Sequence, residues 1–272
     1  MPTSTGNATQ RAELERIERY YDTVPRANAS VELHRGLTLF VSTGGYPYYA
    51  RPEYGGTVPI TSAAVAAVRA RQRELGVPQA FEWVHDLRPE LRAAVAATGM
   101  TVFSLPLMVC RTVVDPGDVA AQIRVLNAND ADLPAVQAAI GLGFAAPGTA
   151  IGAAGDAERA AATHPDGHDS VRRLVAAGHT VIAGAFLPGG PVAGGSYSPR
   201  DDVAEITGVA TLPAYRRRGI GAALTAALVA DARARDARVV FLSAGSTDIA
   251  RVYARTGFER VATACIASAP SD

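Results

Sequence analysis

Apolar and polar positions alternate with two different periods along the second half of the chain, and these periods separate strands from helices. A period of two, or a short apolar run, predicts strands at residues 122–126, 181–187, 192–198, 203–212, 239–243 and 260–267. A period of three to four predicts helices at residues 133–142, 219–237 and 248–256. Residues 145–169 are rich in Gly, Ala and Pro, and we interpret them as a mobile loop with one short helix. The pattern therefore predicts an α/β fold with a mixed sheet.

The first half repeats part of this order. Without a gap, an offset of 158 places residues 62–102 over residues 220–260. Both stretches predict a helix, a short strand, a second helix and a Thr-Gly-hydrophobic stop, in which glycine suits the left-handed end of a helix. The shared order and lengths favour internal duplication, with chance similarity of two α/β units as the alternative. The Pro-Gly break within residues 111–121 predicts a boundary between an N-terminal domain, residues 1–115, and a second domain, residues 122–272.

Composition excludes several classes of protein. The 272 residues include 26 basic and 26 acidic side chains, and every basic one is arginine. A Schiff-base lysine and a Walker-type phosphate loop are therefore excluded, and zero net charge argues against a nucleic-acid partner. The first ten residues lack the apolar region of a secretory signal, and the longest apolar run, residues 221–230, is too short to span a membrane. We expect a cytoplasmic protein without a membrane partner.

The sequence offers no metal site. Cys110 and Cys265 are too few for a disulfide framework or a structural zinc site, and we expect both to be buried and reduced. His164 and His168 have helical i,i+4 spacing, but a proline and a glycine between them prevent a helical presentation. We therefore expect no metal cofactor.

The stretch TLPAYRRRGIGA, residues 211–222, carries the clearest chemical signal. A strand is predicted to end before its proline, and a helix to begin near Gly219. A helix N-terminus presents free backbone N–H groups and a positive dipole end, which suit an anion. Gly219 and Gly221 remove the Cβ atoms that would hold a phosphate away from those amides. With six arginines and two aspartates in residues 213–238, the stretch predicts a diphosphate site.

The order strand–Pro–x–Tyr–Arg–x–x–Gly–x–Gly–helix resembles the acyl-CoA-binding motif of the GNAT superfamily of N-acetyltransferases. Arg216, Gly219 and Gly221 fill its defined positions, whereas Thr211 stands where the family usually has valine. A dinucleotide-binding G-x-G-x-x-G is excluded because Leu224 occupies the third glycine position. The resemblance implies a mixed, mostly antiparallel sheet flanked by helices and acetyl-CoA as the acyl donor. It implies these cofactor-binding residues: Val209, Ala210, Thr211, Arg216, Arg217, Arg218, Gly219, Ile220, Gly221, Ala222 and Ser246.

Two further positions resemble catalytic residues of this family. Tyr253 begins a Tyr-x-x-x-Gly-Phe stretch, and the resemblance implies that it protonates the departing CoA thiolate; the alternative is a tyrosine that only packs in the core. Glu205 matches a strand carboxylate that deprotonates the incoming amine; the alternative is a solvated or arginine-paired carboxylate. Ser246, seven residues before Tyr253, stands where the family often has a cofactor-contacting asparagine. Backbone N–H groups from Val209 to Thr211 would bind pantetheine and polarise the acetyl carbonyl.

The first half lacks these residues. At the same offset Val95 stands opposite Tyr253, and residues 58–60, Val-Pro-Ile, stand opposite the three arginines. The whole chain therefore resembles a tandem GNAT protein with a degenerate N-terminal half. An aromatic group in this half either packs in the core or forms a wall of an acceptor pocket. Its members are Tyr20, Tyr21, Tyr46, Tyr48, Tyr49, Tyr54 and Trp83.

We expect an acetyl-CoA-dependent N-acetyltransferase that acts on a primary amine, most simply of a small molecule, by direct attack in a ternary complex. The alternative from another class is a non-catalytic acyl-CoA-binding sensor or regulatory module. Transfer of a longer acyl group, or transfer to a hydroxyl, is a further variant. The sequence leaves the acceptor and the oligomeric state open.

Overall fold

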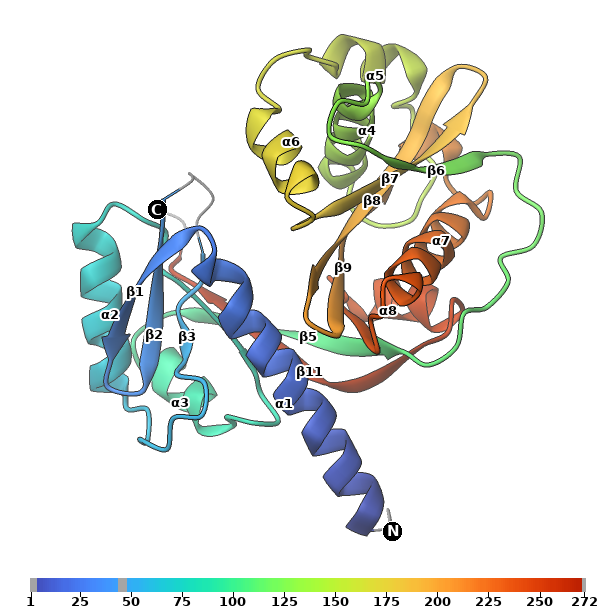
Figure 1. Cartoon of the computed structure of the whole chain (residues 1–272). Coiled ribbons are helices and arrows are strands. Elements are labelled where there is room, and N and C mark those ends of the chain that lie inside the picture. The colour runs from blue at the N-terminus through green and yellow to red at the C-terminus, as the bar shows by residue number, and fades with distance from the viewer. Residues whose placement is uncertain (1–3, 44–47, 271–272) are drawn as a thin grey trace. The chain divides into compact units, whose positions relative to one another are not determined.

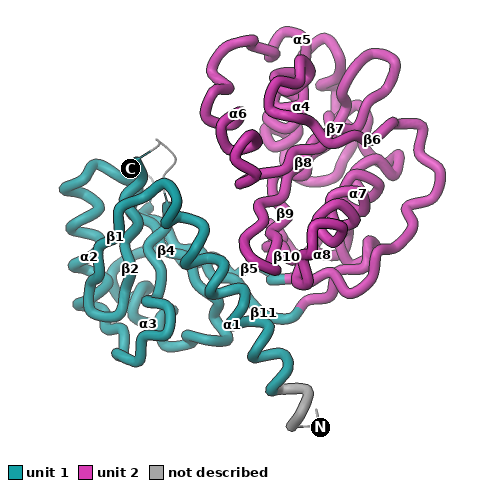
Figure 2. The backbone as a smooth tube through the Cα atoms, in the orientation of Figure 1, with its two compact units in different colours: residues 1–107, 261–272 teal, residues 108–260 magenta. Residues whose placement is uncertain are grey.

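The computed structural model describes residues 4–43 and 48–270. The chain divides into two compact units (Figure 2): unit 1 contains Met1–Leu107 and Val261–Asp272, and unit 2 contains Met108–Arg260. Tyr46, one of the aromatic residues considered above, lies outside the described residues.

Within its described residues, unit 1 contains three helices, a small three-stranded sheet and strands from one end of a larger sheet (Figure 1). Its elements are α1 (Ser4–Arg26), β1 (Ala29–His34), β2 (Leu37–Ser42), β3 (Arg51–Pro52), α2 (Ser62–Glu74), β4 (Ala80–Val84), α3 (Glu90–Ala96) and most of β5 (Thr101–Cys110). Strands β1, β2 and β3 form a three-stranded antiparallel sheet. Helix α1 has no counterpart among the sequence-based predictions.

Unit 2 carries the other strands of the larger sheet, in the order β10-β9-β8-β7-β6. Its elements are β6 (Gln122–Leu126), α4 (Leu133–Ala145), α5 (Asp156–Ala162), α6 (Asp169–Ala176), β7 (Val181–Leu187), β8 (Gly190–Arg200), β9 (Val203–Thr211), a 3-10 turn (Pro213–Tyr215), α7 (Ile220–Ala234), β10 (Val239–Ser243), α8 (Thr247–Ala254) and the start of β11 (Phe258–Ser268). Strands β9 and β10 are parallel, whereas β6 to β9 pair antiparallel. The predicted mixed, mostly antiparallel α/β fold is confirmed. The strands predicted at residues 122–126, 181–187 and 239–243 have these same bounds in the structure.

Helices α4 and α7 cover opposite faces of the unit 2 sheet. Two adjacent glycines of β8 show this, because successive residues of a strand point to opposite faces. A Cβ atom on Gly194 would clash with Val136 and Ile140 of α4, and one on Gly195 would lie within 3.1 Å of Leu228 of α7. Both helices therefore approach the β8 backbone closely, and the apolar face of α7 fills the core of unit 2.

The two units share an order of elements. In unit 1 a helix, three strands, a helix, a strand, a helix and a strand follow one another from α1 to β5. The same order runs from α4 to β11 in unit 2 once α5 and α6, which lie between α4 and β7, are set aside. Of these two extra helices, α5 matches the one short helix expected in residues 145–169, whereas α6 was not expected.

The compact units do not coincide with the expected division into residues 1–115 and 122–272. Strand β5 passes into unit 2 after Leu107, and β11 passes into unit 1 after Arg260. Ala264–Ser268 of β11 pair antiparallel with β4, so Cys265 lies opposite Trp83 in the unit 1 core. The last strand of the chain is therefore a structural part of unit 1, because its backbone hydrogen bonds are made there.

Candidate functional site

Strand β9 parts from its parallel neighbour β10 midway along its length. The two strands pair over three residues only, ending where Glu205 lies opposite Phe241, although β9 continues to Thr211. On its other edge β9 stays paired with β8 as far as Thr211, with a one-residue bulge. Gly208 lies in this bulge with a φ of +65°, which glycine adopts without strain. Beyond Glu205 the edge of β9 that faces away from β8 can therefore hydrogen-bond a bound molecule as an added strand would.

This segment of β9 contains the three residues predicted to hold pantetheine. Val209, Ala210 and Thr211 are all half-buried. A Cβ atom on Gly143 of α4 would lie 2.7 Å from the Cβ of Ala210, so α4 packs directly on the segment. The close packing fixes the backbone whose amides the prediction uses.

The turn between β9 and α7 contains two residues in the left-handed backbone conformation. After the 3-10 turn Pro213–Tyr215, Arg217 and Gly219 both take the left-handed conformation, with φ values of +64° and +75°, and Ile220 opens the helix. A left-handed residue followed by a helical one directs successive N–H groups toward one side, an arrangement that binds anions. Arg217, Arg218 and Gly219 are exposed. The helix thus presents its first amides at an exposed, positively charged turn.

The start of α7 leaves space above its second residue. A Cβ atom on Gly221 would meet only the Thr211 Oγ1 atom, at an ordinary contact distance of 3.5 Å. Ile220 is buried and anchors the first turn in the core, whereas Ala222 is half-buried. The end of β9 and the start of α7 are therefore neighbours. Gly221 keeps the space between them free of a side chain.

The side chain of Arg216 is turned toward the protein. Its guanidinium donates to the backbone carbonyls of Thr211 (3.2 Å), Gly143 (2.7 Å), Ala146 (2.7 Å) and Ala150 (3.1 Å). The family resemblance implies that all three arginines bind the cofactor. In the structure the donors of Arg216 are committed to carbonyls, and the charge available at the turn comes from the next two positions.

Arg217 and Arg218 differ in how they are held. The guanidinium of Arg218 lies 5.1 Å from the ring centroid of Tyr215 and donates to the Ala214 carbonyl at 3.3 Å. Arg217 contacts no acidic or polar partner among the described residues. Their charges remain close to the first amides of α7 and would attract a phosphate.

Glu205 lies where β9 and β10 part. It is half-buried, between the buried Ala204 and Ile206, and its β-sheet neighbours are Ser198 on β8 and Phe241 on β10. A carboxylate at this position belongs to a rigid strand. It lies at the point where the pairing of β9 and β10 ends, which is the apex of the opening between the two strands. This position suits a base that receives a proton from a group bound in the opening.

Tyr253 lies on α8, the helix that follows β10. Its ring packs edge-on against Phe258, with centroids 5.7 Å apart, at the border of the unit 2 core. Burial raises the pKa of its hydroxyl to about 12, and the hydroxyl has no hydrogen-bond partner among the described residues. Ser246 begins the same helix, and its Oγ atom accepts a hydrogen bond of 3.2 Å from the N–H of Ile249. Tyr253 is therefore a neutral potential donor, and Ser246 is at least a helix cap.

The structure brings together one group of polar residues that no pattern in the sequence indicates. The Tyr215 hydroxyl donates to Asp156 of α5 at 2.5 Å, and the same carboxylate accepts from Arg159 at 2.7 Å. Arg159 is buried and donates to the carbonyls of Gly189 and Pro191 in the β7–β8 turn. The group joins the turn after β9, helix α5 and the hairpin, whose residues are far apart along the chain.

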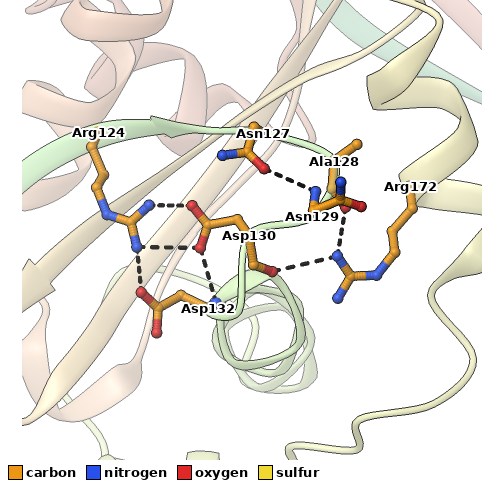
Figure 3. A network of polar contacts seen from close by, with 7 residues as sticks. All are labelled: Arg124, Asn127, Ala128, Asn129, Asp130, Asp132 and Arg172. Atoms are coloured by element: carbon orange, nitrogen blue, oxygen red, sulfur yellow. Dashed lines mark hydrogen bonds and ion pairs between the residues drawn. The ribbon is translucent and has the colours of Figure 1, made fainter.

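A second polar network holds α6 (Figure 3). Arg172 of α6 donates to the backbone carbonyls of Ala128 (2.5 Å) and Asp130 (3.4 Å) in the connection between β6 and α4. Arg124 of β6 forms ion pairs with Asp130 and Asp132 in the same connection. The segment between α4 and β7 is thus fastened at α6 as well as at α5.

Unit 1 lacks the same arrangement at the start of α2. Thr61, which the 158-residue offset places at the position of Gly219, caps this helix with its own side chain, which accepts from the N–H of Ala64 at 3.2 Å. One of the amides that an anion would use therefore already has a partner in the chain.

The parallel strands of unit 1 also differ from those of unit 2. Ala50, which directly precedes β3, forms a parallel bridge with Phe81 of β4. The next residues, Arg51 and Glu82, form a buried ion pair, and Arg51 also stacks on the ring of Tyr21 at 3.9 Å. A buried ion pair thus joins β3 and β4 beside this bridge.

Neither a metal site nor a membrane-spanning helix is found within residues 4–43 and 48–270. No group of three or more His, Cys, Asp or Glu side chains there is arranged to hold a metal ion. No helix of that part combines the length and the apolar character needed to cross a bilayer. Cys110 and Cys265 are buried and form no disulfide.

The fold and the site together define an α/β protein whose parallel strands part beside a glycine-containing, arginine-rich helix start. Residues 154–258 match the family model described as the acetyltransferase (GNAT) family. The matched part contains the parted strand, the turn, α7 and α8. No curated protein matches the chain.

Solved structures with a similar fold cover most of the chain. A GCN5-related N-acetyltransferase from Kribbella flavida has a TM-score of 0.69 and 22% identity, over 95% of this chain and 96% of that one. A GCN5-related N-acetyltransferase from Sphaerobacter thermophilus has a TM-score of 0.57 and 14% identity, over 87% and 81%. A tandem GNAT protein from the clavulanic acid biosynthesis pathway has a TM-score of 0.54 and 18% identity, over 87% and 79%. At these identities the likeness shows the fold.

Proposed function

We propose that unit 2 binds acetyl-CoA and transfers its acetyl group to a primary amine, most simply that of a small molecule. The observation that carries this proposal is the parting of β9 from β10 beside the open start of α7. The exposed edge of β9 can pair with the amide-containing pantetheine arm, and the first amides of α7 can hold the diphosphate. The two features occur on neighbouring segments, in the order that one extended donor molecule requires.

The reaction needs a base, an acid and a polarised carbonyl. Glu205, at the apex of the opening, accepts the proton that the ammonium must lose before its nitrogen can attack the acetyl carbon. Backbone N–H groups of the segment Val209–Ala210–Thr211 stabilise the negative charge that develops on the carbonyl oxygen. The carbon–sulfur bond then breaks, and Tyr253 donates a hydrogen bond or a proton to the leaving thiolate. The amine attacks directly, so no cysteine or other nucleophile of the chain is required.

We also propose that unit 1 is a degenerate copy of unit 2. The shared order of elements supports duplication, and two replacements explain why the chemistry would be lost. Thr61 satisfies an amide that an anion would need, and a buried ion pair joins Arg51 of β3 to Glu82 of β4. Both changes keep the unit folded, because Thr61 accepts from the N–H of Ala64 and Arg51 forms an ion pair with Glu82.

The proposal is tested by incubating the protein with acetyl-CoA and a panel of primary amines while free thiol is measured. We expect thiol release with at least one amine, together with acetylated product in the mass spectrum. Calorimetric binding of CoA without turnover on a broad panel would instead identify an acyl-CoA-binding sensor. Absence of CoA binding would overturn both readings.

A further inference from the structure

The segment that follows α4 is attached to the turn that follows β9. Helix α4 ends at Ala145, and carbonyls in its last turn have no partner within the helix. Arg216 supplies partners for two carbonyls at this end, those of Gly143 and Ala146, and for the carbonyl of Ala150 further on. A guanidinium is well placed at the negative end of a helix dipole. One side chain of the turn therefore both caps α4 and holds the segment after it.

Backbone contacts continue the attachment. The N–H of Gly152 donates to the Pro213 carbonyl at 3.2 Å, and the N–H of Ala214 donates to the Ala154 carbonyl at 3.0 Å. A Cβ atom on Gly152 would lie 3.0 Å from the Pro213 side chain, so the two segments are in close contact. Residues 146–155, expected from their composition to form a mobile loop, thus run along the turn and are hydrogen-bonded to it.

Arg216 is better suited to this task than to holding a phosphate. Its four hydrogen bonds use Nε, Nη1 and Nη2, and all four acceptors are carbonyl oxygens. The two arginines that follow it are exposed at the helix start and supply the charge there. A guanidinium has five N–H donors in one rigid plane, whereas an ammonium group has three on a freely rotating centre and a side-chain amide has two.

We propose that Arg216 is a positioning residue that fastens residues 146–155 to the cofactor turn, so that the two segments move as one. The part concerning catalysis rests on the proposed function, and we place this segment beside the acceptor because Arg216 joins it to Thr211, at the end of the strand that would hold pantetheine. Ordering of the turn by the donor would then also order the segment, and donor and acceptor would strengthen each other's binding reciprocally.

Hydrogen–deuterium exchange of the free protein tests the fastening without any activity. In Arg216→Gln and Arg216→Lys we expect the amides of Gly152 and Ala214 to exchange at least about tenfold faster than in the wild type. The matched control is Arg217→Gln, which removes the adjacent arginine and should leave both rates within about twofold. Circular dichroism checks folding. If the glutamine variant is unfolded, the lysine variant, which keeps the charge at the end of α4, decides.

Kinetics distinguish the fastening from phosphate binding. With an amine found in the panel, we expect Arg216→Lys to raise the acceptor KM by about tenfold, with kcat and the CoA Kd within about threefold. Unchanged exchange in both Arg216 variants would overturn the proposal. If exchange were unchanged and only Arg216→Gln bound CoA about tenfold more weakly, Arg216 would instead be a ligand of the diphosphate. If the wild type releases no thiol, the proposed function fails while the exchange rates still decide the role of Arg216.

Discussion

Gly221 separates the requirements of folding from those of ligand binding. In the structure a Cβ atom at this position meets only a hydroxyl at an ordinary distance, so the fold itself tolerates a side chain there. Phosphate binding at the first amides of α7 does not tolerate a side chain there, because that side chain would block the approach of the phosphate.

We therefore expect Gly221→Val to fold normally and to lose CoA binding. The CoA Kd should weaken by at least about a hundredfold, which corresponds to roughly 2.7 kcal/mol, while the melting temperature changes by less than about 3 °C. Calorimetry and thermal unfolding measure the two effects. Gly141→Val is the matched control, because Gly141 lies in α4 and a Cβ atom there would meet nothing within 4 Å. Normal CoA affinity in Gly221→Val would contradict the proposed diphosphate site.

Tyr253 should act as a neutral donor over a wide pH range. Because burial raises the pKa of its hydroxyl to about 12, the group stays protonated well above pH 8. We expect Tyr253→Phe to lower kcat by more than about tenfold while the acetyl-CoA Kd stays within about threefold. In the wild type, kcat should not fall between pH 8 and pH 10, where an ordinary tyrosine with a pKa near 10 would begin to ionise. An unaltered kcat in the variant would remove Tyr253 from the mechanism.

Glu18 in unit 1 should make stability depend on pH. Burial is the main cause that raises the pKa of this carboxyl from 4.5 to about 7, and its Oε2 atom has no partner among the described residues. A raised carboxyl pKa means that the folded state holds the proton more tightly. The corresponding stability is fully present below pH 4.5 and is lost as the pH rises through 7.

We accordingly expect Glu18→Gln to stabilise the protein at pH 8 by about 2 to 3 kcal/mol and to flatten the pH dependence between pH 4.5 and pH 7. Urea unfolding followed at several pH values measures this. The exposed Glu15 on the same helix provides the control, and Glu15→Gln should change stability by less than about 0.5 kcal/mol. A wild type whose stability does not fall between pH 4.5 and pH 7 would contradict the buried, raised carboxyl.

Helix α5 is short, and contacts of the Arg159 side chain hold it in place. It has seven residues, too few for a helix that is stable alone. Arg159 connects it to the β7–β8 turn through two carbonyls, and Asp156 connects it to Tyr215 beside the candidate cofactor turn. The same elements that build the site are thereby joined to the hairpin of the central sheet.

Loss of Arg159 should consequently destabilise unit 2. We expect Arg159→Ala to lower the free energy of unfolding by about 2 to 4 kcal/mol, because it leaves two carbonyls without their donor and Asp156 without its ion pair. Arg173→Ala, at an exposed arginine of α6, is the comparison and should cost less than about 0.5 kcal/mol. Equal stability of the two variants in denaturant titrations would show that the Arg159 contacts contribute little.

At the scale of the whole molecule, the C-terminal strand completes the N-terminal unit. Strand β11 pairs with β4, and Cys265 and Ala267 are fully buried in the core that contains Trp83. Trp83 is the only tryptophan of the chain. Its fluorescence therefore reports on unit 1 alone.

Removal of residues 261–272 should thus unfold part of unit 1 although it shortens the other end of the chain. We expect the emission of Trp83 to shift to longer wavelength and its unfolding transition to lose cooperativity, because β4 loses a pairing partner and the core loses buried side chains. Deletion of residues 270–272, which follow β11, should leave the emission unchanged. An unshifted spectrum in the longer deletion would contradict the assignment of β11 to unit 1.

Short-range sequence patterns predict much of the secondary structure and indicate the family resemblance. The strands at 122–126, 181–187 and 239–243, the hairpin turn and the start of α7 follow from periodicity and from Gly and Pro, which act within a few residues. Helix α1 escaped prediction because its stability comes from packing that is not visible in a polar N-terminal sequence.

Sequence patterns alone indicate the α/β class, the glycine-containing helix start and the candidate residues Glu205, Tyr253 and Arg216. The surroundings of these residues follow from the tertiary structure. It parts β9 from β10 at Glu205, turns Arg216 toward a carbonyl 73 residues away, and pairs the last strand with β4. These features arise from pairing between distant segments, whose closure entropy is offset by contacts across the fold. Short-range spacing cannot specify such contacts.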